Sequence, residues 1–275
     1  MTLCFDDEVA FARALGLASG LPVQRIARHR FPDGELKLTL PPKLGAEVRI
    51  LRSLHAPNEK LVELILAART ARELGARDLT LVAPYLAYMR QDSAFAAGEV
   101  VSQRVIGRLL ADLFDAVVTV DPHLHRVATL AEAIPLARVV ALSAAPLVGP
   151  DAESAQWVHV AATFNGLPWA VCRKTRHGDT EVEVELPAGQ IEGCEVVLVD
   201  DVASSGHTLA AASRALLAAG AARVDAVVTH AVLAAQAGAT LKAAGISEFW
   251  STDTVPHESN ALSVAPLIAD ALRPA

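Results

Sequence analysis

The sequence predicts an α/β protein of two similar domains, each built on a mostly parallel sheet flanked by helices. Short apolar, β-branched runs alternate with longer stretches of helical spacing, which is typical of βαβ units. Of the 275 residues, 52% are hydrophobic but only 4% are aromatic, so the cores must consist of aliphatic side chains. A strand–helix–strand pattern occurs in each half and predicts domains over 1–145 and 146–275.

The individual elements follow from the periodicity of apolar residues. Each predicted strand is a short apolar run, and each predicted helix places apolar residues three or four positions apart. The predicted strands are 48–51, 79–82, 116–120, 196–199 and 226–229. The predicted helices between them are 58–74, 100–113 and 208–219.

A repeated string supports the division into halves. Asp-Ala-Val-Val-Thr occurs at 115–119 and again at 225–229. Ala-rich α/β chains give such matches by chance, so the string supports two halves without proving them.

Charge and cysteine usage exclude several classes of protein. The net charge of −7 argues against a broad nucleic-acid surface. Cys4, Cys172 and Cys194 form no CxxC pair, so neither a disulfide framework nor a zinc site is expected. No apolar run approaches the ~18 residues of a membrane span, and the chain starts without a basic and apolar leader. A cytoplasmic protein without a membrane partner is expected.

The most informative segment lies after the apolar run 196–199. Two acids, Asp200 and Asp201, come next. A turn then precedes the predicted helix and consists of Ser204, Ser205, Gly206, His207 and Thr208. In such a strand–loop–helix unit a phosphate binds at the helix amino end, and nearby carboxylates can accept hydrogen bonds from sugar hydroxyls. Phosphate together with a vicinal diol describes ribose 5-phosphate.

The alternative for this segment is an ordinary helix cap after a strand that ends in two solvated acids. Each residue alone fits that alternative. Two consecutive acids at the end of a buried strand fit it poorly, because buried charge needs partners.

Residues 199–208 resemble the motif that binds PRPP (phosphoribosyl pyrophosphate) in type I phosphoribosyltransferases and ribose-phosphate pyrophosphokinases. The resemblance implies two phosphoribosyltransferase-like domains, with the nucleotide on the first and ribose 5-phosphate on the second. The motif does not separate the members of this superfamily. His207 stands where many relatives have glycine.

The segment 31–35 resembles the nucleotide loop of the pyrophosphokinases. Its Pro-Asp-Gly core is a tight turn, and alone it would be an ordinary hairpin tip. The resemblance implies that Phe31, Asp33 and Glu35 bind ATP. It also implies a homodimer or higher homo-oligomer, in which this loop reaches a neighbour's site.

The segment 84–92 also resembles the pyrophosphokinases and implies that Arg90, Gln91 and Asp92 bind ATP. Without the resemblance, Arg90 and Asp92 could be a surface ion pair. The later segment 98–102 resembles archaeal-type members.

Metal and catalytic residues are implied in the same way. His123 is the expected ligand on the Mg²⁺ side, with His125 as its competitor and a capping or core role as the alternative. Asp151 is a metal-associated acid. Lys174 and Arg176 belong to a segment that resembles the catalytic loop; they point the same way on an extended chain, whereas a solvated basic turn is the alternative.

The chain departs from the family pattern at two positions. Glu153 replaces a glycine of the pyrophosphate loop and adds charge where pyrophosphate approaches. Ser93 replaces a residue that is often basic. The expected reaction is diphosphoryl transfer from Mg-ATP to ribose 5-phosphate, giving PRPP and AMP. The alternatives are a phosphoribosyltransferase and a weakly active regulatory homologue.

Overall fold

The computed structural model describes residues 1–123, 137–140, 147–151, 154–155, 158–159, 169–177, 181–185 and 191–273. The chain forms two compact units, one of Met1–Val140 with Ser263–Ala275 and one of Ala141–Leu262. The predicted α/β class with two mostly parallel sheets is confirmed. The prediction from sequence places the last segment in the second domain. The structure groups it with the first unit, because α8 (Ala265–Ala271) packs against α1 (Val9–Ser19).

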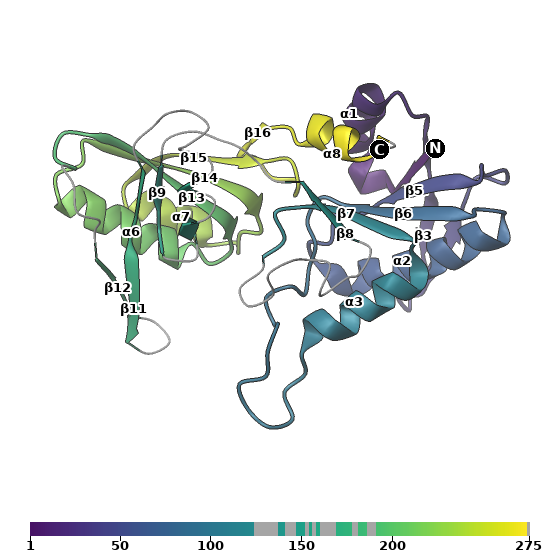
Figure 1. Cartoon of the computed structure of the whole chain (residues 1–275), viewed down its shortest axis with the longest axis horizontal. Helices are drawn as coiled ribbons and strands as arrows, with labels where there is room; N and C mark the ends of the chain where they lie inside the picture. The colour runs from purple at the N-terminus through teal and green to yellow at the C-terminus, as the bar shows by residue number, and fades with distance from the viewer. Residues whose placement is uncertain are drawn as a thin grey trace. The chain divides into compact units, whose positions relative to one another are not determined.

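The first unit is a parallel sheet covered on both faces. The strand order is β2-β1-β5-β6-β7-β8, and all neighbouring pairs are parallel. The strands are β1 Thr2–Cys4, β2 Val23–Arg25, β5 Glu47–Leu51, β6 Asp78–Ala83, β7 Ala116–Val120 and β8 Ala137–Val140. Helices α1 and α8 lie on one face, and α2 (Pro57–Glu73) and α3 (Ser102–Leu113) lie on the other (Figure 1).

The second unit repeats this plan. Its strand order is β10-β9-β13-β14-β15-β16, again with parallel pairs. The strands are β9 Leu147–Gly149, β10 Trp169–Val171, β13 Glu195–Ala203, β14 Arg223–Ala231, β15 Ile246–Thr252 and β16 Asn260–Leu262. Helices α6 (His207–Ala218) and α7 (Ala237–Ala243) pack against each other (Figure 1).

Each unit also carries an antiparallel hairpin outside its main sheet. In the first unit it consists of β3 (Ala27–Arg30) and β4 (Leu36–Thr39). In the second it consists of β11 (Arg173–His177) and β12 (Glu181–Glu185). Both hairpins hold residues that the sequence assigns to the site.

The cores are mostly aliphatic, as the composition predicts, with Phe5 and Phe114 as buried aromatic members of the first. Fully buried Leu64 and Leu81 represent the first core, and Leu198 and Leu216 the second. Burying such side chains contributes about 1.5 to 3 kcal/mol each. None of the described helices combines the length and the apolar composition needed to span a bilayer.

Candidate active site

The second unit carries the adjacent acids Asp200 and Asp201 near the carboxyl end of β13. The strand does not end at Val199, as the sequence predicts, but continues to Ala203. It continues because its parallel pairing with β14 persists, with Asp200 opposite Val228. The acids therefore belong to the last part of a strand in the middle of the sheet, where ligands of parallel α/β sheets bind.

The electrostatics of these acids are unfavourable in the free protein. Asp200 is half-buried and Asp201 is buried. Burial, followed by the negative charges of Asp201 and Asp151, raises the pKa of Asp200 well above its ordinary value. A carboxylate in this situation is stabilised by a cation or by hydrogen-bond donors. The end of β13 is therefore suited to receive hydroxyl groups or a positive charge.

Asp151 reaches the same edge of the sheet from the neighbouring strand. It follows β9, which pairs with β13 through Val148 and Leu198. Ser154 closes the turn, because its N–H donates to Asp151 Oδ1 over 3.3 Å and its hydroxyl donates to the Asp151 carbonyl over 2.6 Å. Glu153, the departure in the pyrophosphate loop, lies outside the described residues.

The turn after β13 requires a glycine for two reasons. Gly206 caps the amino end of α6 with a φ of 76°, a conformation that glycine adopts at little cost. A Cβ at this position would lie 3.1 Å from Leu241 Cδ2 of α7. The Ser205 hydroxyl accepts the N–H of His207 over 3.4 Å. The predicted members Ser204, Ser205, Gly206, His207 and Thr208 thus surround a helix amino end, which favours an anion.

The predicted catalytic residues lie on β11. The register pairs Lys174 with Val184 and Arg176 with Val182. That Lys174 and Arg176 act together on a phosphoryl group stays a prediction.

In the first unit, the predicted nucleotide loop joins β3 to β4. The Phe31 N–H donates to the Glu35 carbonyl over 2.9 Å, and Gly34 turns the chain with a φ of 95°. The Glu35 N–H donates to Asp33 Oδ1 over 3.1 Å. Phe31, Asp33 and Glu35 are all exposed, and the Phe31 ring meets only the edge of the neighbouring His29 ring among the described aromatic contacts. The loop therefore presents its side chains outward.

The segment after β6 mixes exposed and buried groups. Arg90 is exposed, Gln91 is half-buried and Asp92 is buried. The Gln91 side chain donates from Nε2 to the main-chain carbonyl of Ser93 over 3.2 Å. The main-chain carbonyl of Gln91 accepts a hydrogen bond from the Gln103 N–H over 3.2 Å. Ser93, the second departure, thus takes part in holding this segment through its main chain.

His123 follows β7 and is half-buried. Its predicted metal partner Asp151 belongs to the other unit. His125, the competing histidine, lies outside the described residues. Among the described residues, no three His, Cys, Asp or Glu side chains gather closely enough to hold a metal by themselves.

Two features were missed by sequence reasoning. Asp121 directly follows β7, is buried, and has a φ of 33°, a region that non-glycine residues rarely adopt. Its position directly after a buried strand is the signal that identified Asp200, so it could have been found. The second feature is a buried ion network around Arg52, for which the sequence gives no local pattern.

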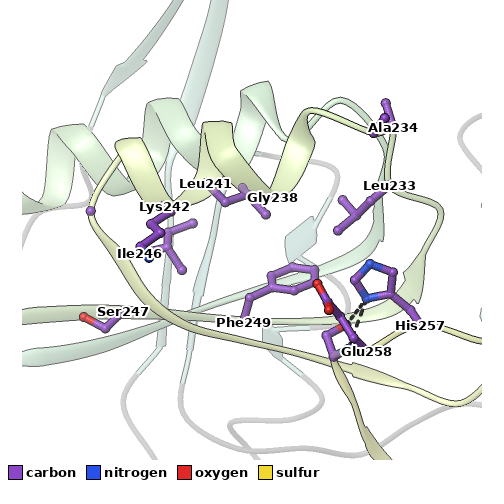
Figure 2. Close-up of a pocket in the computed structure, with 13 residues that line it drawn as sticks. Leu233, Ala234, Gly238, Leu241, Lys242, Ile246, Ser247, Phe249, His257 and Glu258 are labelled. Atoms are coloured by element: carbon purple, nitrogen blue, oxygen red, sulfur yellow. Dashed lines mark hydrogen bonds between the residues drawn. The ribbon is translucent and has the colours of Figure 1, made fainter.

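A separate cavity of about 760 Å³ lies in the second unit between α7 and β15 (Figure 2). Leu241 and Phe249 line its apolar side, and His257 and Glu258 line its polar side. The Ser259 N–H donates to His257 Nδ1 over 3.1 Å. None of the predicted site residues lines this cavity.

Comparison with known families agrees with this arrangement. Residues 3–113 match the family model described as the N-terminal domain of ribose phosphate pyrophosphokinase. Residues 124–243 match the model of the phosphoribosyl transferase domain. The first match favours the pyrophosphokinases over the phosphoribosyltransferase alternative.

Individual relatives cover nearly the whole chain. The chain is 34% identical to the ribose-phosphate pyrophosphokinase of Methanopyrus kandleri, over 99% of this chain and 98% of that protein. It is 36% identical to ribose-phosphate pyrophosphokinase 2 of Archaeoglobus fulgidus, over 94% and 95%. The fold is similar to the crystal structure of phosphoribosylpyrophosphate synthetase from Mycobacterium smegmatis, with a TM-score of 0.84 and 24% identity over 98% and 96% of the two chains. The chain therefore belongs to the ribose-phosphate pyrophosphokinase family, as its resemblance to archaeal-type members predicts.

Proposed function

We propose that this protein transfers the β,γ-diphosphoryl group of Mg-ATP to the 1-hydroxyl of ribose 5-phosphate. A bond forms between that hydroxyl oxygen and the β-phosphorus, and the bond from the β-phosphorus to the α,β-bridging oxygen breaks. AMP leaves with the bridging oxygen, PRPP is formed, and the hydroxyl proton is lost to solvent. The observation that carries the proposal is the crowding of Asp151, Asp200 and Asp201 beside the Gly206 turn.

Ribose 5-phosphate would bind at the end of β13. Its phosphate would meet the backbone N–H groups at the start of α6, with added hydroxyl donors from Ser204, Ser205 and Thr208. Asp200 and Asp201 would accept hydrogen bonds from the ring hydroxyls. The raised pKa of Asp200 supports this role, because donated hydrogen bonds stabilise the ionised carboxylate.

ATP would bind through the first unit. Arg90 would contact its phosphates, with Gln91 and Asp92 beside it. Phe31, Asp33 and Glu35 would contact the nucleotide of a neighbouring subunit, since their exposed hairpin tip suits contact with a second molecule. A homodimer or a higher homo-oligomer belongs to this proposal.

Catalysis of phosphoryl transfer depends on placing the reactants in line and neutralising the charge on the transferred group. Lys174 and Arg176 would supply positive charge from one face of β11. Asp151 and His123 would hold a Mg²⁺ ion, because carboxylate oxygen suits Mg²⁺ and a cation would relieve the like charges around Asp200. When bound, Mg²⁺ would neutralise charge on the phosphoryl oxygens.

The test is an assay of the purified protein with Mg-ATP and ribose 5-phosphate, followed by phosphorus NMR and nucleotide chromatography. AMP and PRPP should appear in equal amounts, and a chelator should abolish both. Release of ADP or absence of PRPP would contradict the proposal.

Two alternatives give different results in the same experiment. A phosphoribosyltransferase would consume added PRPP together with a nucleobase and would not use ATP. A regulatory homologue would show no turnover but would change the activity of an active synthetase mixed with it. A cytoplasmic location, expected from the sequence, also belongs to the proposal.

A further inference from the structure

The first unit contains a network of buried charges that the proposed mechanism does not use. Its centre is Arg52, which directly follows β5 and is only 1% exposed. The guanidinium lies 2.7 Å from Asp7 Oδ1 and 2.5 Å from Glu63 Oε2. It also stacks 4.5 Å from the centre of the Phe5 ring. A charged group this deeply buried requires such partners.

Glu63 connects this centre to the hairpin that carries the nucleotide loop. It lies on α2 and is fully buried. One carboxylate oxygen contacts Arg52, and the other accepts a hydrogen bond of 2.5 Å from Arg28. Arg28 belongs to β3, three positions before Phe31. A single carboxylate thus bridges the end of β5 and the base of the nucleotide loop.

The other side of the network reaches a second segment predicted to bind ATP. Ser53, next to Arg52, donates its N–H to Glu8 Oε1 over 2.5 Å, and its carbonyl accepts a hydrogen bond of 2.7 Å from Lys60. The Leu54 N–H then donates to the Tyr85 carbonyl over 2.8 Å. Tyr85 belongs to the segment 84–92, which contains Arg90.

A network of this kind is a poor way to gain stability. Removing ions from water costs several kcal/mol per ion, and apolar residues of similar volume often stabilise a protein equally well or better. What such a network does supply is a fixed geometry, since its charge-assisted hydrogen bonds, from Arg28 to Glu63 and from Arg52 to Asp7, have preferred directions. Its members join the base of the nucleotide loop, proposed to reach the ATP of a neighbouring subunit, to the segment proposed to bind ATP in this subunit.

We propose that Arg28 and Glu63 are positioning residues that anchor the base of the nucleotide loop to α2, and so set the affinity for the ATP that the loop contacts in a neighbouring subunit. This inference rests on the proposed function. Neither residue needs to touch the nucleotide. Their effect is exerted through Phe31, Asp33 and Glu35, whose hairpin they fix at its base.

The test compares steady-state kinetics of the full-length protein and its variants. Glu63→Gln removes the charge that both arginines share and should raise KM for ATP about 10-fold, since small misplacements of binding groups have large effects. Arg28→Gln should raise KM for ATP several-fold. Its site is less buried, and the substitution leaves the Arg52–Glu63 contact intact. KM for ribose 5-phosphate should stay within twofold in both. Arg28→Lys should restore part of the loss.

Glu73→Gln provides the matched control, because Glu73 is an exposed residue of the same helix. It should leave both KM values unchanged. A role in folding alone would lower kcat through loss of active protein while KM for ATP stayed constant, and that result for both Glu63→Gln and Arg28→Gln would overturn the inference. An equal rise in both KM values would overturn it as well.

Hydrogen exchange separates this inference from the proposed function. In Arg28→Gln, the amides of β3 and β4 should exchange faster, and those of the second unit should not change. If the wild-type protein has no diphosphokinase activity but the hairpin responds in this way, the function is wrong and the network stands. If the wild type is active and the variants change neither KM for ATP nor hydrogen exchange, the inference about Arg28 and Glu63 is wrong and the function stands.

Discussion

The two units carry opposite electrostatic arrangements at corresponding strand ends. Strand β5 leads to α2 and β6 in the first unit, and β13 leads to α6 and β14 in the second. After β5 the chain places a buried cation, Arg52, among the carboxylates of Asp7 and Glu63. At the end of β13 it places Asp200 among the carboxylates of Asp201 and Asp151.

The difference separates a structural arrangement from one prepared for a ligand. Where opposite charges meet inside the protein, Arg52 finds its counter-charges without a ligand, although burial still raises the pKa of Glu8 beside it to about 7. Where like charges meet, the pKa of Asp200 rises, so its ionised form would be stabilised by a bound cation or hydrogen-bond donor. The same strand end would thus serve geometry in one unit and recognition in the other.

The largest expected effect concerns Lys174, whose positive charge is proposed to act on the phosphoryl group transferred in the second unit. Lys174→Ala should lower kcat on the order of 10³-fold, since a cation that stabilises a transferred phosphoryl group contributes this much. The rate of AMP formation at saturating substrates measures it. Thr175→Ala, at the neighbouring position of β11, is the control and should retain activity. An unchanged kcat in Lys174→Ala would remove the hairpin from the mechanism.

The next effect tests whether the like charges serve ribose 5-phosphate. Asp200→Asn should raise KM for ribose 5-phosphate about 10- to 100-fold, because charge-assisted hydrogen bonds contribute about 1.5 to 3 kcal/mol. It should also raise the Tm of the free protein by about 2 to 4 °C, because the substitution removes a repulsive charge. The sign follows from the raised pKa of Asp200: its ionisation costs stability once the pH exceeds the ordinary carboxyl range.

Glu248→Gln is the control for Asp200→Asn, since Glu248 is an exposed residue of β15. Both Tm and KM should remain as in the wild type. A lower Tm in Asp200→Asn would mean that Asp200 is satisfied within the protein, and the contrast between the strand ends would disappear.

A smaller effect concerns the turn that follows β13. Gly206→Ala should destabilise the protein by about 1 to 3 kcal/mol, because a residue with Cβ is strained at this φ and would crowd Leu241. Gly238→Ala in α7 is the matched control, because a Cβ there has open space and alanine favours helix. Thermal unfolding of both variants decides between them. Equal stability would show that the turn tolerates side chains.

Much of the fold could be predicted from the sequence because buried parallel strands are continuous apolar runs. The strand 116–120 coincides with β7, and the helix 58–74 with α2 to within a residue at each end. The end of β13 was predicted too early, because apolarity stops at Asp200 while backbone pairing with β14 does not. Hydrogen bonding between strands depends on both partners and cannot be read from one of them.

The repeated Asp-Ala-Val-Val-Thr string illustrates the limit of local similarity. It falls on β7 and β14, which do not correspond, because β7 is two strands from β5 and β14 is next to β13. The Gly206 turn was predictable from its composition. The contacts of Glu63 with Arg28 and Arg52 were not, because they join three elements that come together only in the folded chain.

The smallest expected effect concerns His55, which lies near Arg52 after the end of β5. Burial, followed by the positive charges of Lys60 and Arg52, lowers the pKa of His55 from 6.5 to about 4. The Lys60 ammonium lies 3.2 Å from Nδ1 and 3.1 Å from Nε2 of its ring. The folded protein therefore keeps His55 neutral between pH 6.5 and about 4, whereas the unfolded chain binds a proton. Stability should fall as the pH is lowered through this window.

Removing the histidine should remove this part of the pH dependence. As the pH is lowered from 6.5 to 4, the unfolding free energy of His55→Asn should rise by about 1 kcal/mol relative to that of wild type. This value is reduced from the full effect of the pKa shift because the ring is partly exposed. Urea unfolding at several pH values measures both unfolding free energies, and their difference removes the titrations that both proteins share.

Glu8 contributes to the pH dependence in the opposite direction. Burial raises its pKa to about 7, so its stabilisation is complete below pH 4.5 and is lost as the pH rises through 7. His29→Asn, on the exposed face of β3, should leave the pH profile unchanged. A pH profile of His55→Asn parallel to that of wild type would mean that Arg52 and Lys60 do not act on this ring, and that the charges after β5 are less tightly coupled than their distances imply.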